Sequence, residues 1–140
     1  MIGAIIAKKK AFSGFDALNR HDLDTFMTSW AEDGIYIFPG SLSISGETKG
    51  KKAIRELFQK FLDKFPSINF TVKNIFVQNI FALGSTNVIA VEWDVKYKNQ
   101  EGEEFENSGV TVVQVEKGKV VLVREYIFDV ELEKRAWGER

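Results

Sequence analysis

The sequence contains no cysteine and a single histidine, His21. The missing cysteines exclude disulfide bonds and thiolate metal sites, which agrees with a reducing compartment, and we expect the protein to be cytoplasmic. His21 falls in a predicted loop between two helices, where a lone histidine is typical of a solvated turn residue. One histidine without a set of clustered carboxylates cannot form a zinc site, so no metal ion is expected.

Charge of one sign and long apolar runs are also scarce. The chain carries 19 basic and 20 acidic residues, for a formal net charge of −1. This balance gives no electrostatic reason to expect a nucleic acid or an anionic membrane surface as partner. No apolar run is long enough to cross a bilayer. The glycines at 40, 46 and 50 lack the spacing of a phosphate loop after a strand, so we expect no cofactor.

Apolar residues, by contrast, are abundant. They make up 44% of the 140 residues, and twelve of them are phenylalanine. A chain of this length and composition predicts a single domain over residues 1–140 with one core. So many phenylalanines favour either a deep apolar interior or a hydrophobic cavity.

The first half of the chain shows mainly helical periodicity. A first helix is predicted to end near residues 19–21, and a second over 22–33, capped by Asp22, turns Leu23, Phe26 and Trp30 inward. A short strand over 35–38 and a polar loop over 39–50 follow. The inward stripe of the first helix is predicted to consist of Ile2, Ile5, Ile6, Phe12, Phe15 and Leu18.

A third helix over 51–65 is predicted to end before Pro66. Its apolar side consists of Ile54, Leu57, Phe58, Phe61 and Phe65.

The second half of the chain reads as antiparallel strands joined by hairpin turns. A short helix over 130–137, capped by Asp129, follows them. This segregated order predicts an α+β fold, with helices packed on one face of a curved, mostly antiparallel sheet. The four long strands are predicted over 68–83, 86–98, 103–116 and 120–128.

The segment 88–98, VIAVEWDVKYK, has one fully apolar face that includes Trp93. Its other face holds Val88 and Ala90 and becomes polar from Glu92 onward. If helices cover one face of the sheet, large apolar groups remain on the opposite face. Such a patch usually marks an interface, so we expect a homodimer joined through the outer sheet face.

Carboxylates on the strands are the candidate catalytic groups. Glu125 lies among Val121, Val123 and Ile127 on one side of its strand, so it meets either water at the sheet edge or an enclosed pocket. Glu92 and Asp94 share a face of another strand and form either part of a pocket or a solvated face with cross-strand ion pairs. Crowded carboxylates in an apolar pocket supply one protonated acid and one ionised base near neutral pH.

From Phe12 to Trp137 the chain resembles the nuclear transport factor 2-like superfamily. The resemblance lies in the order of elements: a helix, the segment NRHDLDTFMTSWAEDGIYIFPG, a second helix and four long strands. That superfamily includes ketosteroid isomerases, SnoaL-like polyketide cyclases and limonene-epoxide hydrolases. The resemblance implies a cystatin-like α+β roll, with the N-terminal helices in the concave face of the sheet. It argues against a steroid isomerase, because Gly14 and Phe38 stand where that family has its tyrosine donor and its carboxylate base.

The final strand resembles the W-R-D-Y-F-D segment of the epoxide hydrolases more closely. This similarity implies Asp94 as the acid, Glu125 as the base and Tyr36 as a holder of the attacking water. The sequence departs from that family at two positions, where Glu92 replaces an arginine and Phe38 replaces an asparagine. The SnoaL-like cyclases, which use a pocket acid on a greasy polyketide, suit the remaining residues about as well.

Two functions of different classes follow. The first is cofactor-free acid–base catalysis on a hydrophobic small molecule, in the hydrolase, isomerase or cyclase class. The second is a non-catalytic module that binds a hydrophobic ligand or dimerises on the same scaffold. In either case the residues expected to line the pocket beside Asp94, Glu125 and Tyr36 are Phe15, Trp30, Phe38, Phe58 and Glu92.

Overall fold

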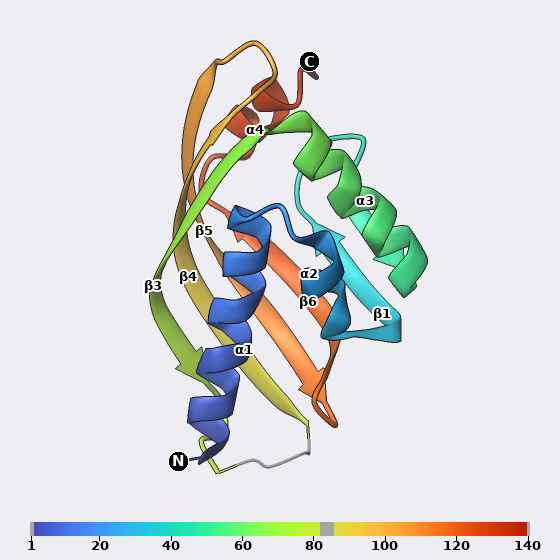
Figure 1. The fold of residues 1–140 in the computed structure, drawn as a ribbon, viewed down its shortest axis with the longest axis vertical. Coiled ribbons are helices and arrows are strands. Elements are labelled where there is room, and N and C mark those ends of the chain that lie inside the picture. The colour runs from blue at the N-terminus through green and yellow to red at the C-terminus, as the bar shows by residue number, and fades with distance from the viewer. Residues whose placement is uncertain (1, 82–85, 140) are drawn as a thin grey trace.

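The computed structural model describes residues 2–81 and 86–139, and a six-stranded curved sheet forms its centre (Figure 1). Helices α1 and α3 lie over the same face of this sheet, so the predicted α+β fold is confirmed. The elements are α1 (Ile2–Asn19), α2 (Leu23–Thr28), β1 (Trp30–Phe38), β2 (Gly46–Lys49), α3 (Lys51–Lys64), β3 (Ser67–Val77), β4 (Asn87–Lys98), β5 (Glu104–Glu116), β6 (Lys119–Ile127) and α4 (Val130–Ala136).

The strand order across the sheet is β2-β1-β6-β5-β4-β3. All neighbours are antiparallel except β1 and β6, which pair in parallel and place Tyr36 beside Val123. The first and last strands of the chain are therefore neighbours in the sheet. This pairing brings Tyr36 near Glu125, although 89 positions separate them in the sequence.

The prediction of a helix over 22–33 is wrong after Thr28. Asp22 does cap α2, since its carboxylate accepts a hydrogen bond from the Thr25 N–H at 3.1 Å. The chain then enters β1, and Trp30 lies on a strand rather than on a helix. The register shifts between Trp30 and Ile35, which breaks strand alternation there and produces spacing that resembles a helix.

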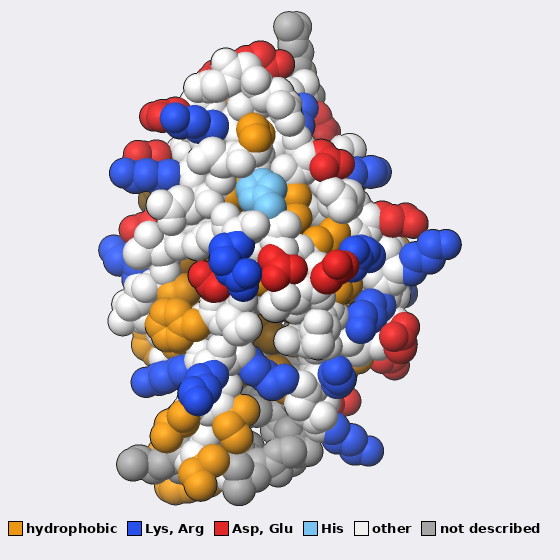
Figure 2. Space-filling view, viewed as in Figure 1, with side chains coloured by type: hydrophobic (Ala, Val, Ile, Leu, Met, Phe, Trp, Pro, Cys, Tyr) orange, Lys and Arg blue, Asp and Glu red, His pale blue; other side chains and the backbone are white. Residues whose placement is uncertain are grey.

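The predicted inward stripe of α1 is wrong for its first two-thirds. Ile2, Ile5, Ile6 and Phe12 are 46–62% exposed. Apolar side chains accordingly gather on the surface over the start of α1 (Figure 2). The residues of α1 that are buried are mostly small ones, Gly3, Ala7 and Ala17, together with Leu18. Small residues allow α1 to approach the sheet closely. The side of the helix that carries them therefore packs on the sheet, and the larger side chains stay exposed.

Two further boundaries differ from the prediction. The 39–50 segment contains a short strand, β2, which pairs with the end of β1. The strand predicted over 68–83 ends at Val77, and shortly after it the Asn87 side chain forms two hydrogen bonds with the Asn79 backbone. Its last two predicted positions, 82 and 83, lie outside the described residues.

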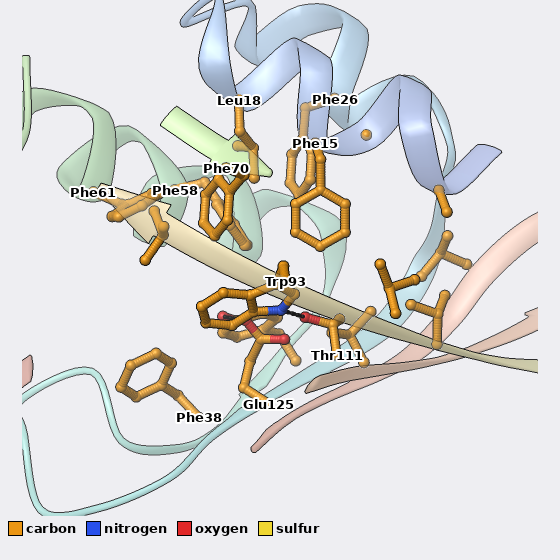
Figure 3. Close-up of a pocket in the computed structure, with 18 of the residues that line it drawn as sticks. Phe15, Leu18, Phe26, Phe38, Phe58, Phe61, Phe70, Trp93, Thr111 and Glu125 are labelled. Carbon is orange, nitrogen blue, oxygen red and sulfur yellow. Dashed lines mark hydrogen bonds between the residues drawn. The ribbon is translucent and has the colours of Figure 1, made fainter. Parts of the chain in front are cut away.

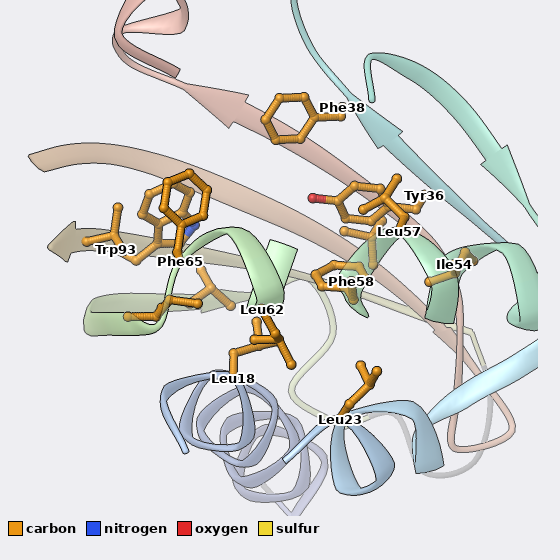
Figure 4. Close-up of a cluster of buried hydrophobic side chains, with 14 of the residues drawn as sticks. Leu18, Leu23, Tyr36, Phe38, Ile54, Leu57, Phe58, Leu62, Phe65 and Trp93 are labelled. Atoms are coloured by element: carbon orange, nitrogen blue, oxygen red, sulfur yellow. The ribbon is translucent and has the colours of Figure 1, made fainter. Parts of the chain in front are cut away.

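The core lies between the helices and the concave face of the sheet (Figure 4). The apolar face predicted for β4 is confirmed, because its inward residues are all at most 4% exposed. Aromatic rings fill the space above it, including Phe65 against Tyr97 at 4.8 Å and Phe58 against Tyr36 at 5.0 Å between centroids. The inward residues of β4 are Ile89, Val91, Trp93, Val95 and Tyr97. None of the helices in the described ranges is long and apolar enough to cross a membrane.

Candidate functional site

An apolar cavity of about 150 Å³ lies between the helices and the concave face of the sheet (Figure 3). A cavity of this size in a protein core holds a molecule of roughly one benzene ring. Its wall consists mainly of aromatic and aliphatic side chains. Besides the three tryptophans, the polar and charged residues that reach it are Lys10, Ser29, Tyr36, Tyr97, Thr111, Glu125 and Glu133.

Glu125 projects from β6 into this cavity, and the residue is half-buried. Its Oε2 accepts a hydrogen bond from the Tyr36 hydroxyl at 3.2 Å. Its Oε1 is buried, and no described residue donates a hydrogen bond to it. A buried oxygen without a donor is costly, and its position in a cavity leaves it available to a bound molecule.

A bulge near the start of β6 changes which residues share the row of Glu125. The register between β5 and β6 shifts at Gln114 and Val115, next to Val120. Val120 therefore lines the cavity together with Val123, Glu125 and Ile127. Simple alternation instead predicted Val121 in this row, and that part of the prediction is wrong. From Val123 onward the alternation holds, and Glu125 faces an enclosed pocket rather than the edge of the sheet.

Burial raises the pKa of Glu125 from 4.5 to about 7. The nearby Thr111 hydroxyl, which lies opposite on β5, and the hydrogen bond from Tyr36 oppose this rise, while the negative charge of Glu133 adds to it. Burial and the neighbouring Glu125 raise the pKa of Tyr36 well above its ordinary range. Tyr36 thus keeps its proton and donates a hydrogen bond, while Glu125 gains or loses a proton near neutral pH.

The Thr111 hydroxyl is held in place by Trp93. The indole N–H of Trp93 donates to the Thr111 oxygen at 2.8 Å, and both residues are buried (Figure 3). This bond uses the Thr111 oxygen as an acceptor and leaves its own O–H free to donate. The arrangement supports the floor of the cavity from two neighbouring strands.

Glu133 is a cavity residue that the sequence analysis missed. It lies on α4, and its Oε1 accepts hydrogen bonds from the Tyr97 hydroxyl at 2.6 Å and from the Asn107 amide at 2.9 Å. Burial raises its pKa. The helical pattern held a usable signal, because residue 133 shares a face with Ala136 and Trp137, which pack against the core.

Asn107 also fixes where α4 begins. Its side-chain amide donates to the Asp129 carbonyl at 2.9 Å and accepts from the Asp129 N–H at 3.1 Å. The Asp129 carboxylate in turn caps the helix by accepting from the Leu132 N–H at 2.9 Å, as predicted. These bonds anchor α4 on β5 and hold Glu133 toward the cavity.

Asp94 and Glu92 lie on the outer, convex face of the sheet, away from the cavity. Asp94 accepts a hydrogen bond from Ser108 at 2.8 Å and pairs with Lys73 at 3.5 Å, and these contacts hold its pKa below its usual range. Glu92 accepts from the Asn74 amide at 2.7 Å. The predicted grouping of Asp94 and Glu92 with Glu125 is therefore wrong, because Trp93 between them faces inward.

The other predicted residues do converge. Tyr36 lies beside Glu125, and four aromatic rings predicted for the pocket all line the cavity. Trp30 does so from β1 instead of from a helix. Within residues 2–81 and 86–139, no three acidic, histidine or cysteine side chains gather as a metal site would require. The four rings are those of Phe15, Trp30, Phe38 and Phe58.

Solved structures share this fold over nearly their whole length. A putative isomerase from Bacillus subtilis aligns with a TM-score of 0.81 at 20% identity, covering 100% of this chain and 98% of its own. Bal32a, from a soil-derived mobile gene cassette, has a TM-score of 0.79 at 18% identity, with 96% and 98% covered. TerC, co-crystallised with polyporic acid, has a TM-score of 0.74 at 13% identity, with 96% and 99% covered.

A protein of unknown function with a cystatin-like fold from Xanthomonas campestris aligns with a TM-score of 0.72 at 24% identity, covering 94% of this chain and 97% of its own. No curated protein sequence matches the chain. The sequence profile of the SnoaL-like domain matches residues 13–123, which include the end of α1, α2, α3, β1 to β5 and the first part of β6. The chain belongs to the SnoaL-like domain family of the nuclear transport factor 2-like superfamily.

Proposed function

We propose that this protein is a small enzyme that performs cofactor-free acid–base chemistry on a hydrophobic small molecule, with Glu125 as its proton-transfer group. The observation that carries the proposal is the unpartnered Oε1 of Glu125 inside an apolar cavity. A carboxyl group with a purely structural role would have both oxygens satisfied. With a pKa of about 7, Glu125 can donate or accept a proton at neutral pH.

The surroundings of Glu125 favour isomerase or cyclase chemistry over epoxide hydrolysis. The epoxide hydrolase site that the resemblance implies uses an acid at residue 94 and polar groups that hold water. Asp94, the acid implied by the resemblance, lies on the outer face, and Phe38 supplies no hydrogen bond to water. Among the structural neighbours, the Bacillus subtilis protein is described as a putative isomerase, which supports the same choice.

A non-catalytic ligand-binding module is the second candidate function. The largely apolar wall favours it, because binding a greasy ligand requires no proton transfer. The co-crystal of TerC with polyporic acid supports ligand binding on this fold but fits an enzyme as well. The two candidates differ in what the loss of the Glu125 carboxyl group would do.

The test compares Glu125→Gln with the wild type on a panel of single-ring ketones and lactones. We expect kcat/KM to fall by roughly 10²- to 10⁴-fold, as is typical of a lost general acid or base, while binding of phenol measured by calorimetry persists. Asp94→Asn, on the outer face, serves as the matched control and keeps full activity. Equal turnover by Glu125→Gln and the wild type would overturn the catalytic proposal. Phenol binding without turnover by any of the three proteins would favour the binding module.

We also propose a homodimer formed through the outer sheet face. Tyr126 is 52% exposed and Phe128 90% exposed, and both lie beside Val110 on this face. Phe76, 61% exposed, extends the apolar surface onto β3 beside Ala90. An exposed apolar patch of this kind favours association with a second copy. Sedimentation at micromolar concentration is expected to show a dimer that Tyr126→Asp dissociates, and a monomeric wild type would contradict the proposal.

The near-zero net charge supports a protein that acts on small molecules without nucleic acid as partner. The absence of cysteine supports a cytoplasmic location. Fractionation of the producing cells tests the location, and recovery of the protein outside the cytoplasm would contradict it.

A further inference from the structure

Two carboxyl groups reach the same cavity from different elements. Glu125 comes from β6 and Glu133 from α4, and both line the cavity wall. Each has one oxygen held by a tyrosine: Tyr36 donates to Oε2 of Glu125 at 3.2 Å, and Tyr97 donates to Oε1 of Glu133 at 2.6 Å. The second donor to Glu133, from Asn107, also goes to Oε1. Within the described ranges, Oε1 of Glu125 and Oε2 of Glu133 accept no hydrogen bond.

A structural role accounts only in part for a carboxyl group at residue 133, which lies in the first turn of α4, where a negative charge is favourable. The side-chain oxygen of a glutamine would accept the same two hydrogen bonds from Tyr97 and Asn107. It would also avoid the cost of placing an ionisable group in an apolar interior. The carboxyl group therefore adds something that this local network does not need, which is the ability to carry a proton.

The two carboxyl groups also influence each other. The negative charge of Glu133 raises the pKa of Glu125, and burial raises the pKa of both. Two acids in one apolar site do not both ionise readily, so over a range of pH the pair holds one proton. Glu133, with two donors on its carboxylate, is the better stabilised anion. Glu125, which accepts one hydrogen bond, from Tyr36, is the better holder of the proton.

Resting on the proposed function of Glu125, we propose that Glu133 is the second catalytic group of the cavity and that the pair enolises a small carbonyl compound. Glu133 removes a proton from the carbon next to the carbonyl, and the C–H bond breaks. Its electron pair forms the new C=C bond, the carbonyl π pair moves to oxygen, and that oxygen takes the proton of Glu125. The proton on Glu133 then passes to the same carbon or to a conjugated one, and the enol O–H proton returns to Glu125 as the carbonyl forms again. These transfers restore the Glu133 carboxylate and the Glu125 acid without an oxidant or water.

The cavity limits the substrate in size and polarity. Its volume of about 150 Å³ suits a single six-membered ring or a short chain. The aromatic rings of the wall contact the apolar part of the substrate. The carbonyl oxygen of the substrate is expected to lie at Oε1 of Glu125, the group that donates a proton to it. The class of substrate is therefore a compact, hydrophobic ketone or aldehyde with a hydrogen on the adjacent carbon.

The first test follows exchange of the α-hydrogens of cyclohexanone in D₂O by proton NMR. We expect the wild type to accelerate exchange over buffer and both Glu133→Gln and Glu125→Gln to lose at least about 100-fold of this acceleration. Glu131→Gln, an exposed carboxyl group on the same helix, is the matched control and retains it. Full exchange by Glu133→Gln with loss in Glu125→Gln would overturn the role of Glu133 and leave the proposed function standing.

A second test does not depend on turnover. The side-chain carboxyl signal of Glu125 is titrated by carbon-13 NMR in the wild type, Glu133→Gln and Glu131→Gln. Removal of the Glu133 charge is expected to lower the pKa of Glu125, and Glu131→Gln is expected to leave it in place. An unchanged pKa in Glu133→Gln would overturn the coupling. If the wild type exchanges no better than buffer, the enolisation step is overturned, while turnover of lactones that requires Glu125 would preserve the proposed function.

Discussion

Glu125 and Asp94 belong to the same sheet, yet the two carboxyl groups have opposite properties. On the concave face, burial raises the pKa of Glu125 to about 7 and one oxygen has no donor among the described residues. On the convex face, Ser108 and Lys73 hold the pKa of Asp94 below its usual range. The chemistry of a carboxyl group in this protein depends on which face of the sheet it occupies, because only one face is closed off from water.

The same contrast appears between adjacent residues of β4. Trp93 points into the core and is 3% exposed, whereas its neighbours Glu92 and Asp94 point outward. Strand alternation turns one step along the chain into a change from a dry interior to a polar surface. Four predictions follow from this difference between the two faces.

The largest effect is expected from a charge placed on the inner face. Val91→Asp buries a carboxyl group where Val91 is 0% exposed, and should lower the free energy of unfolding by roughly 3–5 kcal/mol. Ala90→Asp, one residue away on the outer face, should cost less than about 1 kcal/mol in the monomer. Urea denaturation of both variants measures the difference, and equal losses would contradict the contrast between the faces.

A second effect is a dependence of stability on pH. Since folding raises the pKa of Glu125 from 4.5 to about 7, its contribution is fully present below pH 4.5 and is lost as pH rises through 7. The loss amounts to about 3 kcal/mol at roughly 1.4 kcal/mol per pH unit. Urea titrations from pH 4.5 to 8 should show this decline, and Glu125→Gln should flatten it. An equal decline of stability with pH in Glu125→Gln would show that other groups cause the pH dependence.

A smaller effect is expected where β5 approaches the core closely. A Cβ atom at Gly109 would lie 2.5 Å from the Tyr126 carbonyl oxygen and 2.6 Å from the Trp93 ring. Gly109→Ala should therefore lower the free energy of unfolding by about 1–3 kcal/mol, since the backbone or the indole must shift. Ser108→Ala, the neighbouring position on the outer face, is the control in thermal unfolding. A Gly109→Ala variant as stable as the wild type would contradict this prediction and show that the sheet adjusts to the added Cβ atom.

The smallest effect is expected on the outer face. Asp94→Asn removes an ion pair with Lys73 in which both side chains are about half exposed. Such pairs contribute little, because water screens them. Thermal unfolding at low and high salt, at concentrations below those at which the proposed dimer forms, should show no measurable change from the wild type. A substantial loss of stability under these conditions would contradict the contrast between the two faces.

Strand patterns predicted the inner face of β4 correctly, because alternation needs only local geometry. The same pattern contained the answer for Asp94, since Trp93 on the apolar face forces its two neighbours outward. The family resemblance placed Asp94 in the site against that pattern. Trp30 was assigned to the wrong element because its strand depends on β6, a partner about 90 positions later.

Glu133 could have been found from helix periodicity, but its bonds to Tyr97 and Asn107 could not. Those residues lie 36 and 26 positions away and meet it only when α4 docks on β5. The exposure of Ile2, Ile5 and Ile6 could not be predicted from the sequence either. The side of α1 that packs on the sheet depends on how closely the helix approaches the sheet.

The amino-acid sequence by itself determined the α+β class, the apolar face of β4 and the family, since these follow from local periodicity, turn residues and sequence similarity. Only the tertiary structure decided that Tyr36, Glu125 and Glu133 meet in one cavity and that Asp94 stays outside it. The physical reason is that pKa values and unsatisfied oxygens depend on burial, and burial arises only when strands and helices distant along the chain close around a common space.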